Sequence, residues 1–493
     1  MISRFTRRAT LVGLLAALPS PAAEPQAPPP REAPPSLEQR AARHLERIRQ
    51  DGAALRAFLR AFPKGADLHT HLTGAVYAES YIQWAAELPL CIDVLSFAYR
   101  DGTAGPPVTC RNVASERPAA EVLQDPVLHR NVVDALSMRN WHMARGSGHD
   151  QFFDTFVKFD AITREGRDAS PELMSRAVAE VMRRATLQQV QHLELMVTFD
   201  SLGDVPSDAV SWESDAQFEV ARQQFAATLA ERVANRRRWL DSVEAEKRAI
   251  LRCGTASASP SCGMSLRFLA QVLRGVSPRQ VFAQSMLAFE LASADSRVAG
   301  VNLVMPEDWF VPMRDHDLHM RMFRFLRRLH PGVRVALHAG ELALGLVPPE
   351  KLGLHVRQAI VVGGAERIGH GTDVLYDADA TGLLREMARR RIAVEISLSS
   401  SDLILGVRGA RHPLRQFLRA GVPVVLATDD EGVARSDLSN EYQRGVEEQG
   451  LTYLQLKSIS RNSIEFSFLP ADDRARLRKS LETAFARFEA DLR

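Results

Sequence analysis

The sequence lacks the cysteine spacing of a zinc-binding module. It contains only four cysteines in 493 residues, Cys91, Cys110, Cys253 and Cys262, and no two of them are separated by two residues. This argues against a Cys₄ zinc site. The cysteines form two local pairs, and residues typical of loops lie between the members of each pair. In an oxidising compartment we expect the disulfides Cys91–Cys110 and Cys253–Cys262; the alternative is four unpaired small core residues.

An excess of charge of either sign is also absent. The formal net charge is +2, from 62 Lys and Arg against 60 Asp and Glu. Residues 1–23 contain three arginines and no acid, so their removal leaves 59 basic against 60 acidic residues. This balance gives no support for a basic nucleic-acid-binding face.

No hydrophobic run is long enough to span a bilayer near the N-terminus. Ala9–Leu18 is a short apolar run that follows Arg4, Arg7 and Arg8 and precedes small residues up to Ala23. This pattern predicts a signal peptide over residues 1–23, and the paired arginines leave Sec or twin-arginine export open. We therefore expect an exported protein, periplasmic or secreted; the alternative is a disordered or lipid-touching N-terminus. The Pro- and Ala-rich composition of residues 24–35 predicts a linker.

The rest of the chain shows neither an internal repeat nor a second domain with its own linker. Residues 36–62 have helical periodicity, which Asp51-Gly52 could interrupt, and short apolar runs then alternate with helical segments. The expected strands are Ala66–Leu72, Leu193–Phe199, Leu266–Leu273, Val298–Val304, Val333–His338, Arg367–His370, Ala393–Ser397 and Val422–Thr428. Eight strands in alternation with helices predict an α/β fold, a (β/α)₈ TIM barrel over residues 63–493 with an insertion at about residues 80–185.

Residues whose side chains can bind a metal or transfer a proton lie at the C-terminal ends of four of these expected strands. His69 and His71 are two residues apart on one strand, so both imidazoles point to the same side. His338 ends a later strand and precedes Ala339-Gly340-Glu341, whose small residues allow a tight turn. Catalytic residues of such barrels sit at the C-terminal ends of strands. Each motif alone is weak, because a strand-end histidine is more often a partner in a hydrogen-bond network.

Two further motifs complete the set. His370 lies between two glycines, where it could stand beside a metal-bound water, and Thr428-Asp429-Asp430 follows the last strand. An Asp-Asp pair after a strand is often a helix N-cap, but the joint order of four motifs favours a site. Three histidines and Asp429 with an open position suit Zn²⁺. No strand-end lysine is present to bridge two metals, so we expect one zinc per subunit. His316 and His319 are interpreted as a helix-spaced pair on a polar turn.

Over residues 60–470 the chain resembles the adenosine deaminase family of the metal-dependent hydrolase superfamily. The resemblance rests on Lys64–Ala75, His338–Glu341, Arg367–Asp373 and Thr428–Asp430, and the N-terminal segments resemble the extracellular growth-factor-type branch and its bacterial periplasmic relatives. It implies that His69, His71, His338 and Asp429 bind zinc. It also implies that Glu341 protonates the ring nitrogen, that His370 orients the hydroxide and takes its proton, and that Asp430 bonds the imidazole side of a purine.

The sequence departs from the family pattern around the nucleoside. Thr73 stands where intracellular members carry an Asp that helps hold ribose. In the segment from Gly300 to Glu307, Met305 and Pro306 stand near the place of a glycine that approaches the purine. We expect Thr73, Gly300 and Met305, with Asp430, to contact substrate.

The expected function is zinc-dependent hydrolytic deamination of adenosine or 2′-deoxyadenosine to the inosine product and ammonia. One alternative keeps the zinc chemistry but acts on another amino-purine or a small amine or amide. Another is a non-catalytic extracellular binding protein. The expected partner is a small purine nucleoside, with no nucleic acid and no stable membrane insertion after signal removal. Relatives in this branch often dimerise, so a homodimer is an alternative to a monomer.

Overall fold

The computed structural model describes residues 35–105, 108–112, 114–141, 147–205, 212 and 214–492. The predicted signal peptide and nearly all of the predicted linker lie outside these residues. Residues 1–36 and 37–493 are two separate units, and the arrangement below is that of the second. None of the described helices combines the length and the apolar character that crossing a bilayer requires.

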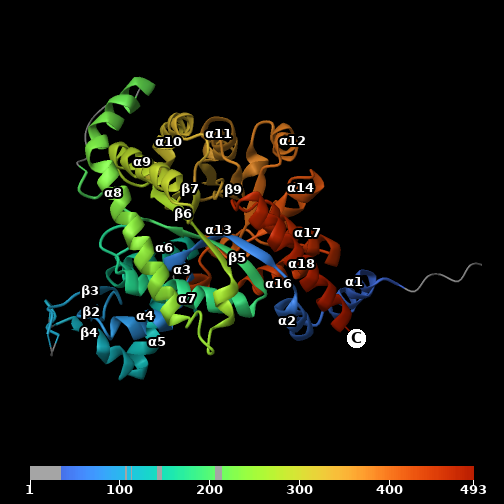
Figure 1. Cartoon of the computed structure of the whole chain (residues 1–493), viewed down its shortest axis with the longest axis horizontal. Helices are drawn as coiled ribbons and strands as arrows, with labels where there is room; N and C mark the ends of the chain where they lie inside the picture. Colours follow the sequence, from blue (N-terminus) through green and yellow to red (C-terminus); the bar gives the residue numbers. More distant parts are fainter. Residues whose placement is uncertain are drawn as a thin grey trace, which may run out of the picture. The chain divides into compact units, whose positions relative to one another are not determined.

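Eight parallel strands form one sheet in the order β1-β5-β6-β7-β8-β9-β10-β11 (Figure 1). A parallel bridge between Thr70 of the first strand and Asp429, just after the last strand, closes the sheet into a barrel. The predicted TIM barrel is therefore confirmed, and each expected strand has a counterpart within a few residues. The strands are β1 (Gly65–His71), β5 (Val190–Val197), β6 (Ser265–Leu273), β7 (Val298–Val304), β8 (Arg334–Ala339), β9 (Arg367–His370), β10 (Ala393–Ile396) and β11 (Val424–Leu426).

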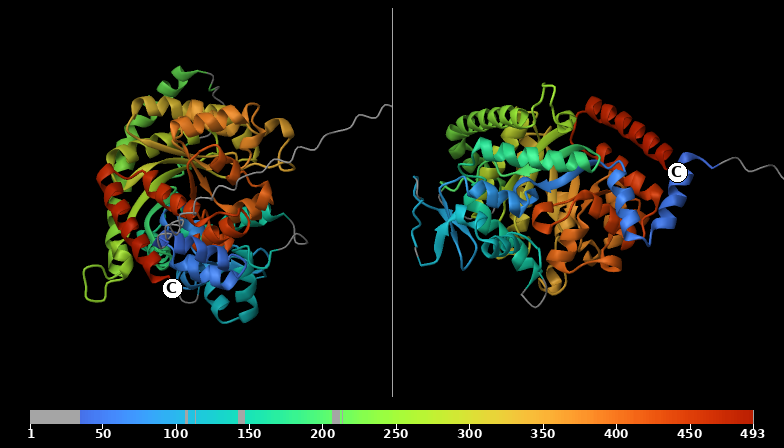
Figure 2. Two further views of the ribbon diagram at one scale, coloured as in Figure 1. Left: turned by 90° about the vertical axis from the view of Figure 1, so that its right-hand side faces the viewer. Right: turned by 90° about the horizontal axis from the view of Figure 1, so that it is seen from below.

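Helices follow the strands and cover the outside of the barrel (Figures 1 and 2). Helix α9 shows a local cause of their placement: Ser277 and Gln280 form a capping box and Pro278 occupies the first turn. The helices after the strands are α8 (Asp215–Ile250), α9 (Pro278–Ala294), α10 (Phe310–Leu329), α11 (His355–Gln358), α12 (Ala380–Arg390), α13 (Leu398–Leu405), α14 (Leu414–Arg419), α15 (Glu431–Ala434), α16 (Leu438–Glu447), α17 (Tyr453–Glu465) and α18 (Ala471–Asp491).

The segment predicted as one N-terminal helix forms two, α1 (Leu37–Ile48) and α2 (Gly52–Ala61). The Asp51 carboxylate accepts hydrogen bonds from the amides of Ala53 and Ala54 at 3.1 and 3.0 Å. This N-cap starts a new helix at the position where the sequence allowed an interruption.

The chain between β1 and β5 contains an antiparallel sheet and several helices. Strands β2 (Leu90–Asp93), β3 (Tyr99–Asp101) and β4 (Glu116–Pro118) form the sheet in the order β3-β2-β4, near α4 and α5 in Figure 1. The helices are α3 (Leu72–Ala75), α4 (Ala78–Ala85), α5 (Pro126–Ala135), α6 (Gly148–Thr163) and α7 (Pro171–Leu187). Of these, α6 is important for function, because its side chains cover the C-terminal end of the barrel.

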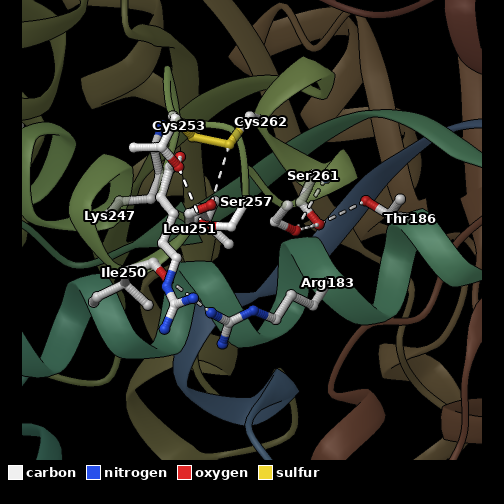
Figure 3. The surroundings of a disulfide bond; sticks show 12 residues. Arg183, Thr186, Lys247, Ile250, Leu251, Cys253, Ser257, Ser261 and Cys262 are labelled. Atoms are coloured by element: carbon white, nitrogen blue, oxygen red, sulfur yellow. Dashed lines mark hydrogen bonds between the residues drawn. A yellow bond between two sulfur atoms is a disulfide. The ribbon is translucent and has the colours of Figure 1, made fainter.

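Both expected disulfides are formed, Cys91–Cys110 in the inserted sheet and Cys253–Cys262 after α8. Figure 3 shows the second of them beside α7. In this region Arg183 donates to the carbonyl of Ile250 at 3.0 Å, and the hydroxyls of Thr186 and Ser261 are 3.0 Å apart. The disulfide thus closes a loop whose flanks are tied to α7.

Candidate metal and catalytic site

Side chains from two strand ends and one turn that follows a third strand converge at the mouth of the barrel. They are His69 and His71 on β1, His338 on β8 and Asp429 after β11, with ligand atoms all within 4.8 Å of one another. Nε2 of His71 lies 3.2 Å from Nε2 of His338 and 3.2 Å from Oδ1 of Asp429. Nε2 of His69 lies 3.4 Å from the same carboxylate oxygen. The structure therefore brings together the four residues that the sequence predicted as ligands.

Each histidine of this group is oriented by an oxygen on its far side. The contacts are Nδ1 of His69 to Oε2 of Glu395 at 2.7 Å, Nδ1 of His71 to Oε1 of Gln271 at 2.8 Å, and Nδ1 of His338 to Oδ1 of Asn302 at 2.9 Å. These oxygens can only accept, so Nδ1 must carry the proton in each ring. The three Nε2 atoms are then free to bind a cation, as in histidine metal sites with outer partners.

The unpaired nitrogens test whether this group fits a metal. Nε2 of His69 is completely buried and has no hydrogen-bond partner, which is costly for a polar atom. Nε2 of His71 and Nε2 of His338 face each other as two acceptors. A divalent cation among them would satisfy all three nitrogens, and imidazole nitrogens and carboxylate oxygens are both ligands that zinc accepts in proteins. The residues present fit a zinc ion.

Two residues of the site have backbones in the left-handed region, where side chains are disfavoured. The φ angles are +59° at Asp429 and +67° at His370. Asp429 is held there by β1, because its amide donates to the carbonyl of His69 and its carbonyl accepts from the amide of His71, both at 2.9 Å. Such local strain is typical of functional sites whose surroundings fix the geometry.

Glu341 and His370 lie beside the ligand group and are both buried. Oε1 of Glu341 is 3.7 Å from Nδ1 of His370, and both residues lie with Asp429 in a second cluster of ligand-type atoms. Burial, reinforced by the negative charges of Asp429 and Glu307, raises the pKa of Glu341 well above its usual range. Burial lowers the pKa of His370 to about 4. Near neutral pH this pair offers a protonated carboxyl group and a neutral imidazole, an acid and a base.

A cavity of about 380 Å³ opens directly over this pair. Asp430, Thr73 and Met305, three of the residues predicted to contact substrate, line it. Burial, opposed by His71 and reinforced by Asp429, raises the pKa of Asp430 to about 8. Thr73 donates to Oε2 of Glu165 at 2.6 Å, so a carboxylate lies beside Thr73 in the lining of the cavity.

Gly300, the fourth of these residues, is not among those that line the cavity. A Cβ atom at Gly300 would lie 2.7 Å from the carbonyl oxygen of Arg334 and 2.9 Å from Cδ2 of Phe468. The glycine therefore allows β7 to pack closely against β8 and Phe468. The structure thus gives Gly300 a packing role, and its contact with substrate stays a prediction.

One wall of the cavity is aromatic, and the described residues that line the cavity include no lysine or arginine. Among the described lining residues are Phe152, Phe153, Phe156 and Phe159 of α6, with Trp309, whereas Lys and Arg are absent from that lining. Its charged residues are carboxylates. A flat, uncharged ring system is therefore a better fit than an anionic group.

Sequence reasoning missed the outer partners Glu395, Gln271 and Asn302. Glu395 and Asn302 each lie within an otherwise apolar strand and are completely buried, whereas the strand of Gln271 also contains Ser265 and Arg267. A lone polar residue inside a buried strand is the signal that could have found Glu395 and Asn302. It does not reveal which histidine each one contacts, because that depends on the stagger between strands.

The family model described as "Adenosine deaminase" matches residues 128–484. An adenosine deaminase from Shewanella denitrificans is 35% identical over 182 residues, 36% of this chain and 48% of that protein, so the chain matches about half the length of this relative. An aminodeoxyfutalosine deaminase from Streptomyces avermitilis is 26% identical over 426 residues, 85% of this chain and 94% of the relative.

Solved structures agree on the fold. An amidohydrolase from Burkholderia ambifaria, crystallised with bound Zn, superposes with a TM-score of 0.57 at 19% identity. The match covers 89% of this chain and 94% of the Burkholderia chain. At this identity the likeness shows a shared architecture. The family model, however, spans well over half of the sequence and includes His338, Glu341, His370 and Asp429. The chain belongs to the adenosine deaminase family.

Proposed function

We propose that this protein is a zinc-dependent hydrolase that converts adenosine or 2′-deoxyadenosine into inosine or 2′-deoxyinosine and ammonia. The proposal rests on one observation: an acid, a base and a group of residues able to bind a metal ion lie together in one cavity. Glu341, His370 and Asp429 all line the same 380 Å³ space. The family supports deamination, and the adenosine deaminase relative supports the substrate.

His69, His71, His338 and Asp429 would hold the zinc ion. Bound there, zinc lowers the pKa of a water molecule toward about 7 and so supplies a nucleophile near neutral pH. Glu395, Gln271 and Asn302 keep the three imidazoles aimed at it. One zinc per subunit agrees with one complete four-residue group at the mouth of the barrel.

The protein's own groups account for the proton transfers. Glu341, protonated because it is buried, donates to the purine ring nitrogen beside the attacked carbon. His370, neutral because it is buried, accepts the proton that the attacking water releases. Asp430 forms a hydrogen bond to the imidazole side of the purine. The water oxygen bonds to C6, and its remaining proton passes to the amino group, which leaves as ammonia when the C6–N bond breaks and the C6 carbonyl forms. The proton held by His370 then restores the protonated form of Glu341. Proton transfer of this kind contributes typically 10²–10⁴-fold to rate.

The cavity favours uncharged nucleosides over phosphorylated ones. The described lining residues include Asp160 and Glu165 and provide no Lys or Arg to pair with a phosphate. An unpaired anion near two carboxylates would be strongly disfavoured. A second candidate is aminodeoxyfutalosine, favoured by the Streptomyces avermitilis relative that matches 85% of this chain. Other amino-purines, small amines or amides, and a non-catalytic binding role are alternatives that the same assay distinguishes.

The test is ultraviolet absorbance of zinc-loaded protein with adenosine, 2′-deoxyadenosine, adenine, AMP and aminodeoxyfutalosine, together with ammonia release. Adenosine should be converted to the hypoxanthine chromophore faster than AMP, and chelated protein should be inactive. Turnover of only another compound of the panel would change the substrate assignment and leave the proposed deamination mechanism intact. No turnover with zinc bound would contradict the proposal.

We further propose that the protein is exported. The support is the signal-like pattern of residues 1–23 and the two disulfides, which persist in oxidising compartments. N-terminal sequencing of the mature protein from a periplasmic or secreted fraction should show cleavage after a small residue near Ala23. An uncleaved protein in the cytoplasm would contradict export.

A further inference from the structure

A second buried cluster lies behind the turn that carries Glu341. It consists of Glu307, which follows β7, His316 on α10 and His355 at the start of α11, all at most 4% exposed. His316 and His319, predicted from sequence to lie on a polar turn, are both buried. The mechanism above uses none of these residues.

Two geometries could explain the cluster. The ligand-type atoms of Glu307, His316 and His355 lie within 4.8 Å of one another, as in a metal site. However, the rings of His316 and His355 are stacked, with centroids 3.7 Å apart and planes only 5° apart. A metal must lie near the plane of each imidazole that binds it, because the nitrogen lone pair lies in that plane. An ion in one of two stacked planes lies far outside the other, so the stack argues against a shared metal.

The Glu307 carboxylate instead holds the backbone of the catalytic turn. Its Oε1 accepts from the amide of Gly340 at 3.0 Å, and its Oε2 accepts from the amide of Glu341 at 2.8 Å. Both oxygens therefore act as acceptors, an arrangement that favours the ionised carboxylate. Nδ1 of His355 also contacts Oε1 of Glu307. Burial alone would raise the pKa of Glu307, but His355 and the nearby Arg274 lower it.

The turn needs such a restraint. Gly340 has a φ of +77°, and a Cβ atom there would overlap the Asp373 carboxylate and lie 2.7 Å from Cγ2 of Val356. A glycine in this position has wide conformational freedom, so sequence alone does not fix where the next side chain points. Arg274 holds the chain two residues before Gly340, because its Nη1 donates to the carbonyl of His338 at 3.2 Å. The turn is thus held from both sides of Gly340.

From this arrangement we infer that Glu307, itself held by His355, is a positioning residue that fixes the Gly340–Glu341 turn and so aims the carboxyl group of Glu341 into the cavity. The consequence for catalysis rests on the proposed function, whereas the restraint on the two amides does not. A misplacement of about 1 Å can cost about 10²-fold in rate, so a loosened turn should affect turnover strongly.

The chain offers informative variants. Glu307→Gln keeps the shape but replaces one acceptor oxygen with an NH₂ group that opposes an amide. His355→Leu removes the contact to Glu307, and His355→Asn keeps a donor near the position of Nδ1. The matched control is Glu441→Gln, since Glu441 is another fully buried carboxylate that accepts a backbone amide, that of Ser399 at 3.0 Å, away from the catalytic turn.

The first measurement is amide hydrogen exchange of a peptide covering residues 338–344 in the zinc-loaded protein. Loss of one hydrogen bond of typical strength corresponds to about fivefold faster exchange. Glu307→Gln and His355→Leu should show at least this acceleration at the Gly340 and Glu341 amides, and His355→Asn and Glu441→Gln should not. Unchanged exchange in Glu307→Gln, or equal acceleration in the control, would overturn the inference whether or not the protein is a deaminase.

The second measurement separates positioning from simple destabilisation and from metal binding. In Glu307→Gln and His355→Leu, kcat should fall about tenfold or more while KM stays within about threefold, and the double variant should be no worse than the poorer single variant. Zinc content should remain one per chain. An unchanged kcat despite faster exchange would overturn the link to Glu341. A second metal equivalent that Glu307→Gln abolishes would replace this inference with a metal site.

Discussion

Oε2 of Glu395 lies 2.7 Å from Nδ1 of His69, and both side chains are completely buried. The other oxygen of Glu395 lies 2.5 Å from Nε of Arg367, which also pairs with Glu194 at 2.7 Å. A row of alternating charges therefore crosses the inside of the barrel and ends at an imidazole of the candidate metal site. The orientation of that imidazole depends on residues that never contact the metal.

The first prediction concerns this row. Glu395→Gln should weaken zinc binding by about 10–100-fold, because an amide oxygen is a weaker acceptor than a carboxylate and raises the basicity of His69 less. Competition with a chelator of known affinity measures the change. Glu441→Gln, which alters an equally buried carboxylate elsewhere, should leave zinc affinity unchanged. Equal affinities in wild type and Glu395→Gln would remove Glu395 from this role.

The second prediction tests the proposed acid. Glu341→Gln should keep one zinc per chain but reduce kcat by at least about 10²-fold, because the amide cannot give a proton to the purine. Steady-state kinetics and metal analysis on the same preparation separate the two effects. Turnover near the wild-type rate would show that another group supplies the proton.

The third prediction contrasts two adjacent aspartates. Asp429→Ala should lose the metal, because it removes the only carboxylate of the four-residue group. Asp430→Asn should retain the metal and lose mainly kcat/KM, since Asp430 lines the cavity without being in that group. Metal analysis after gel filtration distinguishes them. Full zinc occupancy in Asp429→Ala would contradict the ligand assignment.

The fourth prediction is a pH dependence of stability. Burial would raise the pKa of Glu194, but Arg367 and His192 overcome it and lower the pKa from 4.5 to about 2. The unfolded chain therefore binds the proton first as pH falls, and the stability that this group contributes is complete above pH 4.5 and lost toward pH 2. A shift of this size corresponds to about 3 kcal/mol.

Denaturant unfolding of metal-free protein between pH 2 and pH 6 tests this. The difference between wild type and Glu194→Gln should be largest above pH 4.5 and shrink as pH approaches 2. Glu386→Gln, which breaks an exposed pair with Arg389, should give little difference at any pH. A difference for Glu194→Gln that does not change with pH would contradict the prediction.

The fifth prediction concerns the disulfides. The half-cystines Cys91 and Cys110 are 19 residues apart, so replacing both by serine should lower the free energy of unfolding by about 3 kcal/mol through loop entropy. Turnover should persist, because no described residue of β2, β3 or β4 lines the cavity. Thermal unfolding and kinetics of the double variant measure the two effects, and thiol titration of wild type should find no free thiol. Four reactive thiols in the exported protein would exclude both bridges.

The sequence was most informative where local pattern and function coincide. His69, His71 and His338 each terminate an apolar run, so barrel topology alone brings them to one rim. The roles of Glu395 and Asn302 could not be predicted from local pattern. Each is one polar residue in a buried strand, and the histidine that it contacts lies on a different strand. The burial of His316 and His319 was also missed, because their neighbours on α10 are mostly charged, and only tertiary packing covers them. The close packing of Gly300 against Phe468 could not be predicted, because the two residues lie far apart along the chain.

The bridge between Thr70 and Asp429 has a consequence for how the protein matures. The first strand of the barrel and the turn after its last strand meet at this seam, and the candidate ligands His69 and Asp429 lie on its two sides. A chain emerging from the ribosome contains the first two candidate ligands long before the fourth is synthesised. Metal capture is thus possible only after nearly the whole sequence has arrived and the barrel has closed, so acquisition of the ion would mark the completed fold and distinguish it from truncated or misassembled chains.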